Sequence, residues 1–267
     1  MILRKILRKL WREFSSVVLK LAELMVYPLN HHVQHHNSLQ CLGVSDVELN
    51  KIHKQLSWFN KLNYGYWQMD RSRLSILISL TKYSNTLDGL IAECGVYQGK
   101  TAQILFNFKS EKKKLYLFDT FEGFTIEDRA LEERVGMGRD PGSGHINTSV
   151  ELVKNQVSKP ILKGPLVSSD KSLKIFIGKV QETLSEAQYE SYSLVHLDMD
   201  LYGPTLFALK HFTKRMVTGG CILLHDYAVS KQGYSGVAKA VEQVDFTGFA
   251  GPIVLGDQSS ALFVRLN

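Results

Sequence analysis

The stretch "VHLDMDLYGPT" (195–205) runs from an apolar segment straight into two aspartates and then a tyrosine. Asp198 and Asp200 are two positions apart, so on a strand both side chains would point to the same side. Two neighbouring carboxylates are costly to bury unless a positive charge lies between them. The stretch therefore predicts a buried strand whose carboxyl end carries acidic side chains that need a cation.

The segments around this stretch alternate between two patterns. Apolar strand-like runs occupy 89–95, 113–121, 173–179, 192–200 and 219–227, and helical stretches occupy 99–108, 203–216 and 234–245. Near-continuous apolar strands between helices predict an α/β fold, with a mostly parallel sheet covered by helices on both faces. The last segment, 251–267, reads as two strands around a Gly-Asp turn and predicts an antiparallel C-terminal strand at the sheet edge.

Acidic residues gather where the predicted strands end. They are Glu93, Asp119, Asp198, Asp200 and Asp226. Ligands of open parallel sheets bind at the carboxyl ends of the strands. We therefore expect the functional site to lie along this edge.

The loop after the first strand, "AECGVYQGKT" (92–101), resembles two phosphate-binding motifs but matches neither. The Walker motif requires a glycine where this chain has cysteine, and GxGxxG requires a glycine where it has tyrosine. What remains is an acidic residue, Glu93, followed by Gly95 and Gly99, which let the backbone come close to a ligand.

Glu93 would repel a pyrophosphate and attract an ammonium group. Asp119 follows 26 residues later at the end of the second strand, where it could accept hydrogen bonds from both hydroxyls of a ribose. A nucleoside with a cationic attachment fits this pair better than a phosphate-bearing one does. S-adenosylmethionine is such a ligand.

Several motifs, in their order and spacing, resemble one known family. The segments are "AECGVYQGKTAQIL", "LFDTFEGF", "HLDMDLYGPTLFAL", "TGGCILLHDYA" and "GVAKAVEQV", within about residues 65–267. They are similar to the macrocin-type (TylF/MycF/NovP-like) sugar O-methyltransferases. The resemblance implies a Rossmann-like class I methyltransferase sheet, S-adenosylmethionine as cofactor, a divalent metal (Mg²⁺ or Mn²⁺) and a small-molecule sugar acceptor.

The same resemblance implies roles for individual residues. Residues implied to line the cofactor are Met69, Glu93, Gly95, Tyr97, Gly99, Thr101 and Asp119. Residues that fall on the metal-ligand positions are Asp198, His225 and Asp226. Candidate catalytic bases are Asp200 and His145, since part of the family uses the second aspartate of D-x-D and other members use a histidine from the preceding loop.

One position departs from the family pattern. His225 stands where the family has the first aspartate of Asp-Asp-Tyr. Magnesium prefers oxygen ligands, whereas imidazole suits manganese, iron or zinc. Either the metal differs, or His225 points away and Asp226 serves alone, or the site is weakened.

Both candidate bases also have simpler interpretations. Asp200 could cap the helix predicted over 203–216. His145 closes "GMGRDPGSGH" (136–145), which is too rich in glycine and proline for a regular element. This segment could form a lid over the strand ends. A histidine on such a loop could equally be solvated.

The first residues differ in character from the rest of the chain, so we expect an N-terminal extension (1–64) and a methyltransferase domain (65–267). Residues 1–25 hold six basic and two acidic residues, +4 of the total net charge of +6. An amphipathic basic helix over 2–25 could lie in a membrane interface or pack on the body or on a second subunit. Its charges argue against a transmembrane span and a signal peptide.

The remaining residues carry a net charge of only +2, which argues against nucleic-acid binding. Three scattered cysteines fit a reducing cytoplasm, with the inner face of a membrane as the alternative location for a peripheral protein. Two other functions fit the residues: a catechol-type O-methyltransferase, and a non-catalytic nucleoside-binding protein at a membrane surface. The clustered carboxylates argue against the second, because a binding module does not need them.

Overall fold

The computed structural model describes residues 45, 47–49, 51–52, 71–136, 138–161, 170–227, 235–255, 257 and 259–267. The extension predicted over 1–64, with its helix over 2–25, lies almost entirely outside these residues, and Met69 lies outside them as well. Within the described part of the chain, no helix is both long enough and apolar enough to cross a membrane.

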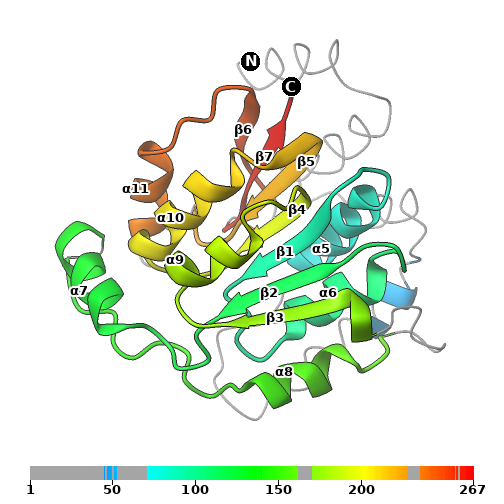
Figure 1. Ribbon diagram of the computed structural model, residues 1–267, viewed down its shortest axis with the longest axis horizontal. Coiled ribbons are helices and arrows are strands. Elements are labelled where there is room, and N and C mark those ends of the chain that lie inside the picture. Colours follow the sequence, from blue (N-terminus) through cyan, green and yellow to red (C-terminus); the bar gives the residue numbers. More distant parts are fainter. Residues whose placement is uncertain are drawn as a thin grey trace.

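Strands alternate with helices as the sequence predicts (Figure 1). The strands are β1 (Leu90–Cys94), β2 (Leu115–Asp119), β3 (Leu173–Ile177), β4 (Tyr192–Leu197), β5 (Met216–Leu224), β6 (Phe249–Val254) and β7 (Ala261–Arg265). The helices are α5 (Arg71–Ser84), α6 (Lys100–Phe108), α7 (Ile126–Val135), α8 (Val150–Val157), α9 (Val180–Thr183), α10 (Tyr202–Phe212) and α11 (Ser235–Glu242), with short 3-10 turns η3 (Asp170–Ser172) and η4 (Leu184–Ala187).

The strands form one seven-stranded sheet in the order β3-β2-β1-β4-β5-β7-β6. The pairs from β3 to β5 are all parallel, and β7 pairs antiparallel with both β5 and β6. The predicted fold class is therefore confirmed. One detail is corrected: the last strand, β7, is inserted one place from the edge, and β6 forms the edge, because the closing hairpin folds back onto β5.

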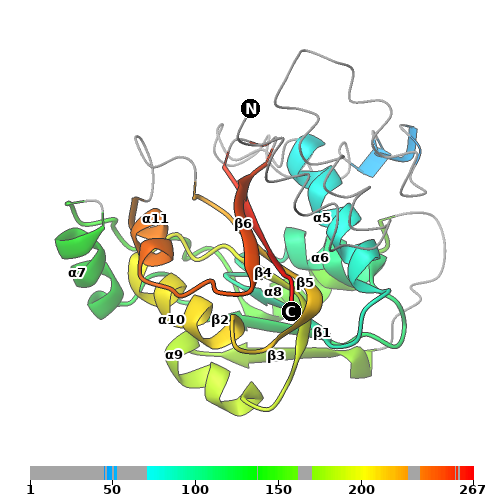
Figure 2. The same ribbon diagram turned by 90° about the horizontal axis from the view of Figure 1, so that it is seen from above.

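Helices cover both faces of the sheet (Figure 1, Figure 2). Strand residues alternate between the faces, so Ile91 and Leu194 join a core with α5, α6 and α8, while Ala92 and Val195 join a second core with α9, α10 and α11. Each face buries a continuous apolar layer, which explains why the strands read as nearly unbroken apolar runs.

The helix α7 anchors the segment that the sequence predicts to be a lid. Glu132 of α7 is fully buried, and its Oε2 accepts a hydrogen bond from the backbone N–H of Tyr202 at 2.7 Å, at the start of α10. Lys239 of α11 donates to the Gly136 carbonyl at 3.0 Å. As predicted, the described residues between α7 and α8 form no helix or strand.

The chain crosses itself closely at the point where the sheet order reverses. Because β1 lies between β2 and β4, the loops after β1 and β4 meet, and the Asp198 N–H donates to the Cys94 carbonyl at 2.9 Å. Gly95 has a φ of +82°, and a Cβ on it would lie 2.0 Å from the Asp198 carbonyl oxygen. Only glycine allows this approach, which brings the two predicted ligand loops together.

Substitution of Gly95 tests this crossing. Gly142 has a similar φ of +80°, but a Cβ there would meet nothing within 4 Å, so it is a matched control for backbone strain alone. We expect Gly142→Ala to lower the free energy of unfolding by about 1–2 kcal/mol and Gly95→Ala by about 3 kcal/mol or more. Urea unfolding followed by far-UV circular dichroism measures both, and equal losses would contradict the close crossing.

Candidate active site

Three residues of the predicted metal site meet where β4 and β5 end. Asp198 follows β4 directly, and His225 and Asp226 follow β5. The strands pair in register, with Leu197 opposite Leu224, and the His225 N–H donates to the Leu197 carbonyl at 2.9 Å. Asp226 then adopts a φ of +59°, so the chain turns sharply after the strand. Strand pairing thus places Asp198 beside His225 and Asp226.

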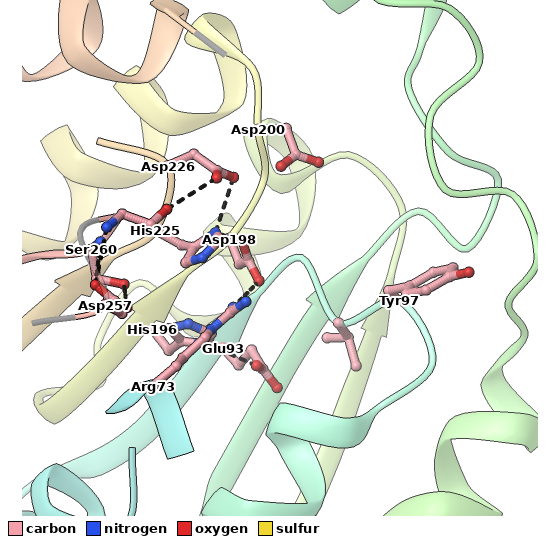
Figure 3. Close-up of polar contacts among 12 residues, drawn as sticks. Arg73, Glu93, Tyr97, His196, Asp198, Asp200, His225, Asp226, Asp257 and Ser260 are labelled. Carbon is pink, nitrogen blue, oxygen red and sulfur yellow. Dashed lines mark hydrogen bonds and ion pairs between the residues drawn. The ribbon is translucent and has the colours of Figure 1, made fainter. Parts of the chain in front are cut away.

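The side chains of these three residues point toward one another (Figure 3). His225 Nδ1 lies 2.8 Å from Asp198 Oδ1 and 3.0 Å from Asp226 Oδ2, and the three residues each offer a ligand atom within 4.8 Å of the others. His225 therefore does not point away from the site, which removes one of the three interpretations of its presence. Among the described residues, neither Nδ1 nor Asp226 Oδ2 has a partner in hydrogen-bond geometry.

An arginine that was not predicted from the sequence completes the charge balance. Arg73 of α5 donates from Nη2 to Asp198 Oδ2 at 2.5 Å. Burial opposes the ionisation of Asp198, but the charges of His225 and Arg73 outweigh it and hold the pKa of Asp198 well below its usual range. Burial lowers the pKa of His225, but the Asp198 charge outweighs this and raises it to about 9. The negative charge of Asp198 is therefore paired with the positive charges of Arg73 and His225.

Asp200, the first candidate base, lies beside this cluster. β4 ends at Leu197 and Asp200 adopts a φ of +64°, so the strand predicted to reach residue 200 is three residues too long. Burial raises the pKa of Asp200 well above its usual range, and the charges of Asp226 and Asp198 raise it further.

His145, the second candidate base, lies close to Asp200. Its Nε2 is 3.6 Å from Asp200 Oδ2, and its ring centroid is 4.8 Å from that of Tyr97. The loop before α8 thus brings both candidate bases and Tyr97 to one place.

Asp119 ends β2 and holds the glycine loop. Its Oδ2 accepts hydrogen bonds from the N–H groups of Val96 at 2.6 Å and Tyr97 at 2.9 Å, and its Oδ1 accepts one from Phe121 at 2.8 Å. Tyr97 is held at a φ of +50°, which is uncommon for a non-glycine residue. Asp119 therefore positions the loop in addition to facing the nearby cavity.

The other residues implied to line the cofactor are distributed unevenly. Gly99 precedes α6 in a left-handed conformation, and Thr101 is buried in the first turn of α6. Glu93 is placed differently from the expectation. Its carboxylate is fully buried and lies 2.8 Å from Nδ1 of His196 on the neighbouring strand, so it faces the interior of the protein and lines neither of the cavities described next.

Two cavities open at the carboxyl ends of the strands. The smaller is lined by the end of β2 and by the residues that lead from β3 into α9, including Phe118, Asp119 and Val180. The larger, about 1080 Å³, is lined by the cluster and by the starts of α6 and α8. Residues shared by both walls are Gly95, Tyr97, His145, Asp198 and Asp200. Two ligands bound in these cavities would meet at this shared wall.

Sequence reasoning missed two charged or polar residues near the cluster. Arg73 lies on a helix 125 residues before Asp198, and His196 lies inside an apolar strand. A single arginine or histidine carries no spacing pattern. Glu93 and His196 lie on one face of the sheet because β1 and β4 pair in that register.

A mostly parallel sheet in this order, with a glycine loop after β1 and an acidic residue ending β2, is the architecture of class I methyltransferases. The solved structure of the O-methyltransferase NovP has this fold: it superposes with a TM-score of 0.63 at 16% identity, over 83% of this chain and 99% of its own.

The chain belongs to the macrocin-O-methyltransferase (TylF) family, whose family model matches residues 7–253. The mycinamicin III 3''-O-methyltransferase of Micromonospora griseorubida is 24% identical over 148 residues, 53% of this chain and 56% of that protein. A Streptomyces olivaceus enzyme, 8-demethyl-8-(2,3-dimethoxy-alpha-L-rhamnosyl)-tetracenomycin-C 4'-O-methyltransferase, is 22% identical over 183 residues, 63% of this chain and 67% of that protein. The chain thus matches just over half the length of the first relative.

The role of Asp119 in holding the loop can be measured directly. Asp119→Ala leaves three backbone N–H groups without a charged acceptor, so we expect the free energy of unfolding to fall by about 2 kcal/mol or more. Asp119→Asn keeps one oxygen and should lose less. Glu186→Ala, an exposed acidic residue, serves as the control. Urea unfolding measures all three, and an Asp119→Ala protein as stable as the control would contradict the anchoring role.

Proposed function

We propose that this chain transfers a methyl group from S-adenosylmethionine to a hydroxyl of a sugar, with a divalent metal beside the acceptor. The observation that carries the proposal is the shared wall of the two cavities, where the acidic cluster borders the pocket at the ends of β1 to β3. Both relatives are O-methyltransferases by name, and the name of the second includes a rhamnosyl group. These names support a sugar acceptor for this chain.

The cofactor would lie in the smaller cavity. Asp119 already accepts three backbone hydrogen bonds. A carboxylate offers about four acceptor positions, so one is left for a ribose hydroxyl rather than two. Gly95 and Tyr97 would lie along the methionine part of the cofactor, because both line the two cavities. Glu93, buried against His196, would support this loop from below instead of touching the cofactor.

The cluster fits a divalent metal by its donor atoms. Asp198 Oδ1, His225 Nδ1 and Asp226 Oδ2 converge, with Nδ1 2.8 Å from the first oxygen and 3.0 Å from the second. A bound ion would take the place of the proton that Nδ1 holds between the two carboxylates. One imidazole with two carboxylates suits manganese, iron or zinc better than magnesium. A bound ion would lower the pKa of a hydroxyl that binds it. Asp198 and Asp226 would hold the ion, and Asp198 lies at the wall that both cavities share.

Asp200 would act as the general base. It lines both cavities and lies beside the cluster, so its carboxylate would be within reach of a hydroxyl bound at the shared wall. His145 is the alternative base, since its Nε2 lies 3.6 Å from Asp200 Oδ2. It could also receive the proton from Asp200. A cap of α10 is the simpler role considered for Asp200. The side chain that accepts a hydrogen bond from the first residue of α10 is that of Glu132, which argues against this role.

A catechol-type diol is the alternative acceptor, because the same cluster could hold any vicinal pair of hydroxyls. The larger cavity, about 1080 Å³, favours a glycosylated acceptor over a catechol. A screen of rhamnosides and catechols with S-adenosylmethionine, read by mass spectrometry, separates the two. Binding of S-adenosylmethionine with no product from any acceptor would favour the non-catalytic alternative.

The proposal includes a role for the N-terminal residues in where the enzyme is held. The basic helix expected over 2–25 would hold the enzyme at the inner face of a membrane or in a homo-oligomer, with the body in the cytoplasm. Flotation with anionic liposomes tests the first role, and the subunit mass tests the second. Deletion of residues 1–25 should abolish whichever of the two is observed.

The metal site makes the sharpest prediction about activity. Chelation and Asp226→Ala should each lower methyl transfer by about 100-fold or more, and both should leave S-adenosylmethionine binding intact, because Asp226 lines only the larger cavity. Asp200→Asn should keep Mn²⁺ binding but lose turnover, because an amide cannot take the proton. Glu186→Ala is the control. Full activity in metal-stripped protein would contradict the proposal.

The identity of residue 225 should set the preferred metal. In the wild type we expect Mn²⁺ to support faster turnover than Mg²⁺, because imidazole is a poor ligand for magnesium. His225→Asp restores an all-oxygen set and should raise the Mg²⁺ to Mn²⁺ activity ratio by about tenfold or more. The ratio is measured at saturating metal. If it is the same in both proteins, His225 is not a ligand.

A further inference from the structure

Asp198 is held from two sides, and the two sides involve different oxygens. Arg73 Nη2 lies 2.5 Å from Oδ2, and His225 Nδ1 lies 2.8 Å from Oδ1 (Figure 3). Arg73 comes from α5, its side chain is 16% exposed, and it lines the larger cavity together with the cluster.

The contact limits what Asp198 can offer to a metal. The guanidinium of arginine stays protonated at any physiological pH, so Oδ2 keeps a charged donor. Only Oδ1, the oxygen on the side of His225 and Asp226, is directed into the cluster. Asp198 can therefore bind an ion through one oxygen, and a two-oxygen contact would require it to break its bond to Arg73.

Metals differ in how much this restriction affects them. Ca²⁺ takes about six to eight oxygen ligands and often uses both oxygens of a carboxylate. Mn²⁺ and Zn²⁺ accept imidazole and bind well through single carboxylate oxygens. A residue that occupies one oxygen of Asp198 should therefore lower the affinity for Ca²⁺ more than the affinity for Mn²⁺. The positive charge alone would repel both divalent ions equally and would leave their ratio unchanged.

We propose that Arg73 is a specificity-determining residue of the metal site: by occupying Oδ2 of Asp198 it keeps that carboxylate monodentate and selects Mn²⁺-like ions over Ca²⁺. The inference rests on the proposed function, because it presupposes an ion at the cluster. It gives α5, which supplies none of the three proposed ligands, a part in the discrimination between Mn²⁺ and Ca²⁺.

The test compares affinities for two metals in the full-length protein. Isothermal titration with Mn²⁺ and with Ca²⁺ gives the affinity ratio for the wild type, Arg73→Met and Arg73→Lys. Arg73→Met frees Oδ2, so the Mn²⁺ to Ca²⁺ ratio should fall about tenfold or more. Arg73→Lys keeps a cationic donor there and should stay within about threefold of the wild-type ratio.

A matched control excludes a general effect of losing an arginine. Arg129 also pairs with an aspartate, Asp140, but in the exposed segment around α7, so Arg129→Met should leave both affinities unchanged. Far-UV circular dichroism and binding of S-adenosylhomocysteine show whether each variant is folded. If Arg73→Met does not fold, Arg73→Leu is used, and the same fall is expected because leucine also has no hydrogen-bond donor.

The possible failures point to different conclusions. No Mn²⁺ binding by the wild type would contradict the proposed function itself. If the wild type binds Mn²⁺ but the ratio of Mn²⁺ to Ca²⁺ affinity is the same in the wild type and in Arg73→Met, only the role of Arg73 is overturned. Loss of the positive charge alone would change both affinities by the same factor and leave their ratio unchanged. A ratio in Arg73→Lys as low as in Arg73→Met would also overturn it, since a donor on Oδ2 would then not control selectivity.

Discussion

The arrangement of the site depends on how Asp198 is held after β4. Its backbone is backed by Gly95, whose missing side chain lets the two loops cross, and its carboxylate lies between Arg73 and His225. A buried carboxylate without these two cations would be protonated or displaced. With them Asp198 stays ionised and fixed, although the carboxyl groups of Asp226 and Asp200 lie close by.

The two cavities lie on either side of this crossing, and Gly95 and Asp198 line both of them. Asp119 holds the glycine loop on one side, and the acidic cluster lies on the other. His145, placed by the loop before α8, lies at the wall that both cavities share. A methyl donor in one cavity and an acceptor in the other would therefore meet next to both candidate bases. This geometry supports group transfer more than it supports binding of a single ligand.

The sequence could predict those parts of the site that follow from strand ends. Apolar runs locate β1, β2, β4 and β5, and a parallel sheet brings the residues after them to one edge, so Asp119, Asp198 and Asp226 were predictable. Contacts that depend on how side chains are oriented in the folded protein could not be predicted from the sequence. Arg73 reaches Asp198 from a distant helix.

Other departures have similar physical causes. Glu93 turns to His196 because the two stand side by side in the pairing of β1 with β4. The insertion of β7 between β5 and β6 depends on how the closing hairpin packs, and hydrophobic periodicity does not report this. The left-handed conformation of Asp200 likewise follows from the turn into α10, where Glu132 fixes the first N–H of the helix.

Anomalous diffraction from crystals of the full-length protein grown with Mn²⁺ and S-adenosylhomocysteine would show whether an ion binds between Asp198, His225 and Asp226. We expect one strong manganese peak within about 2.0–2.3 Å of Asp198 Oδ1, His225 Nδ1 and Asp226 Oδ2, with Arg73 still bound to Asp198 Oδ2. A cluster without a peak at saturating Mn²⁺, with His225 remaining between the two carboxylates, would contradict it.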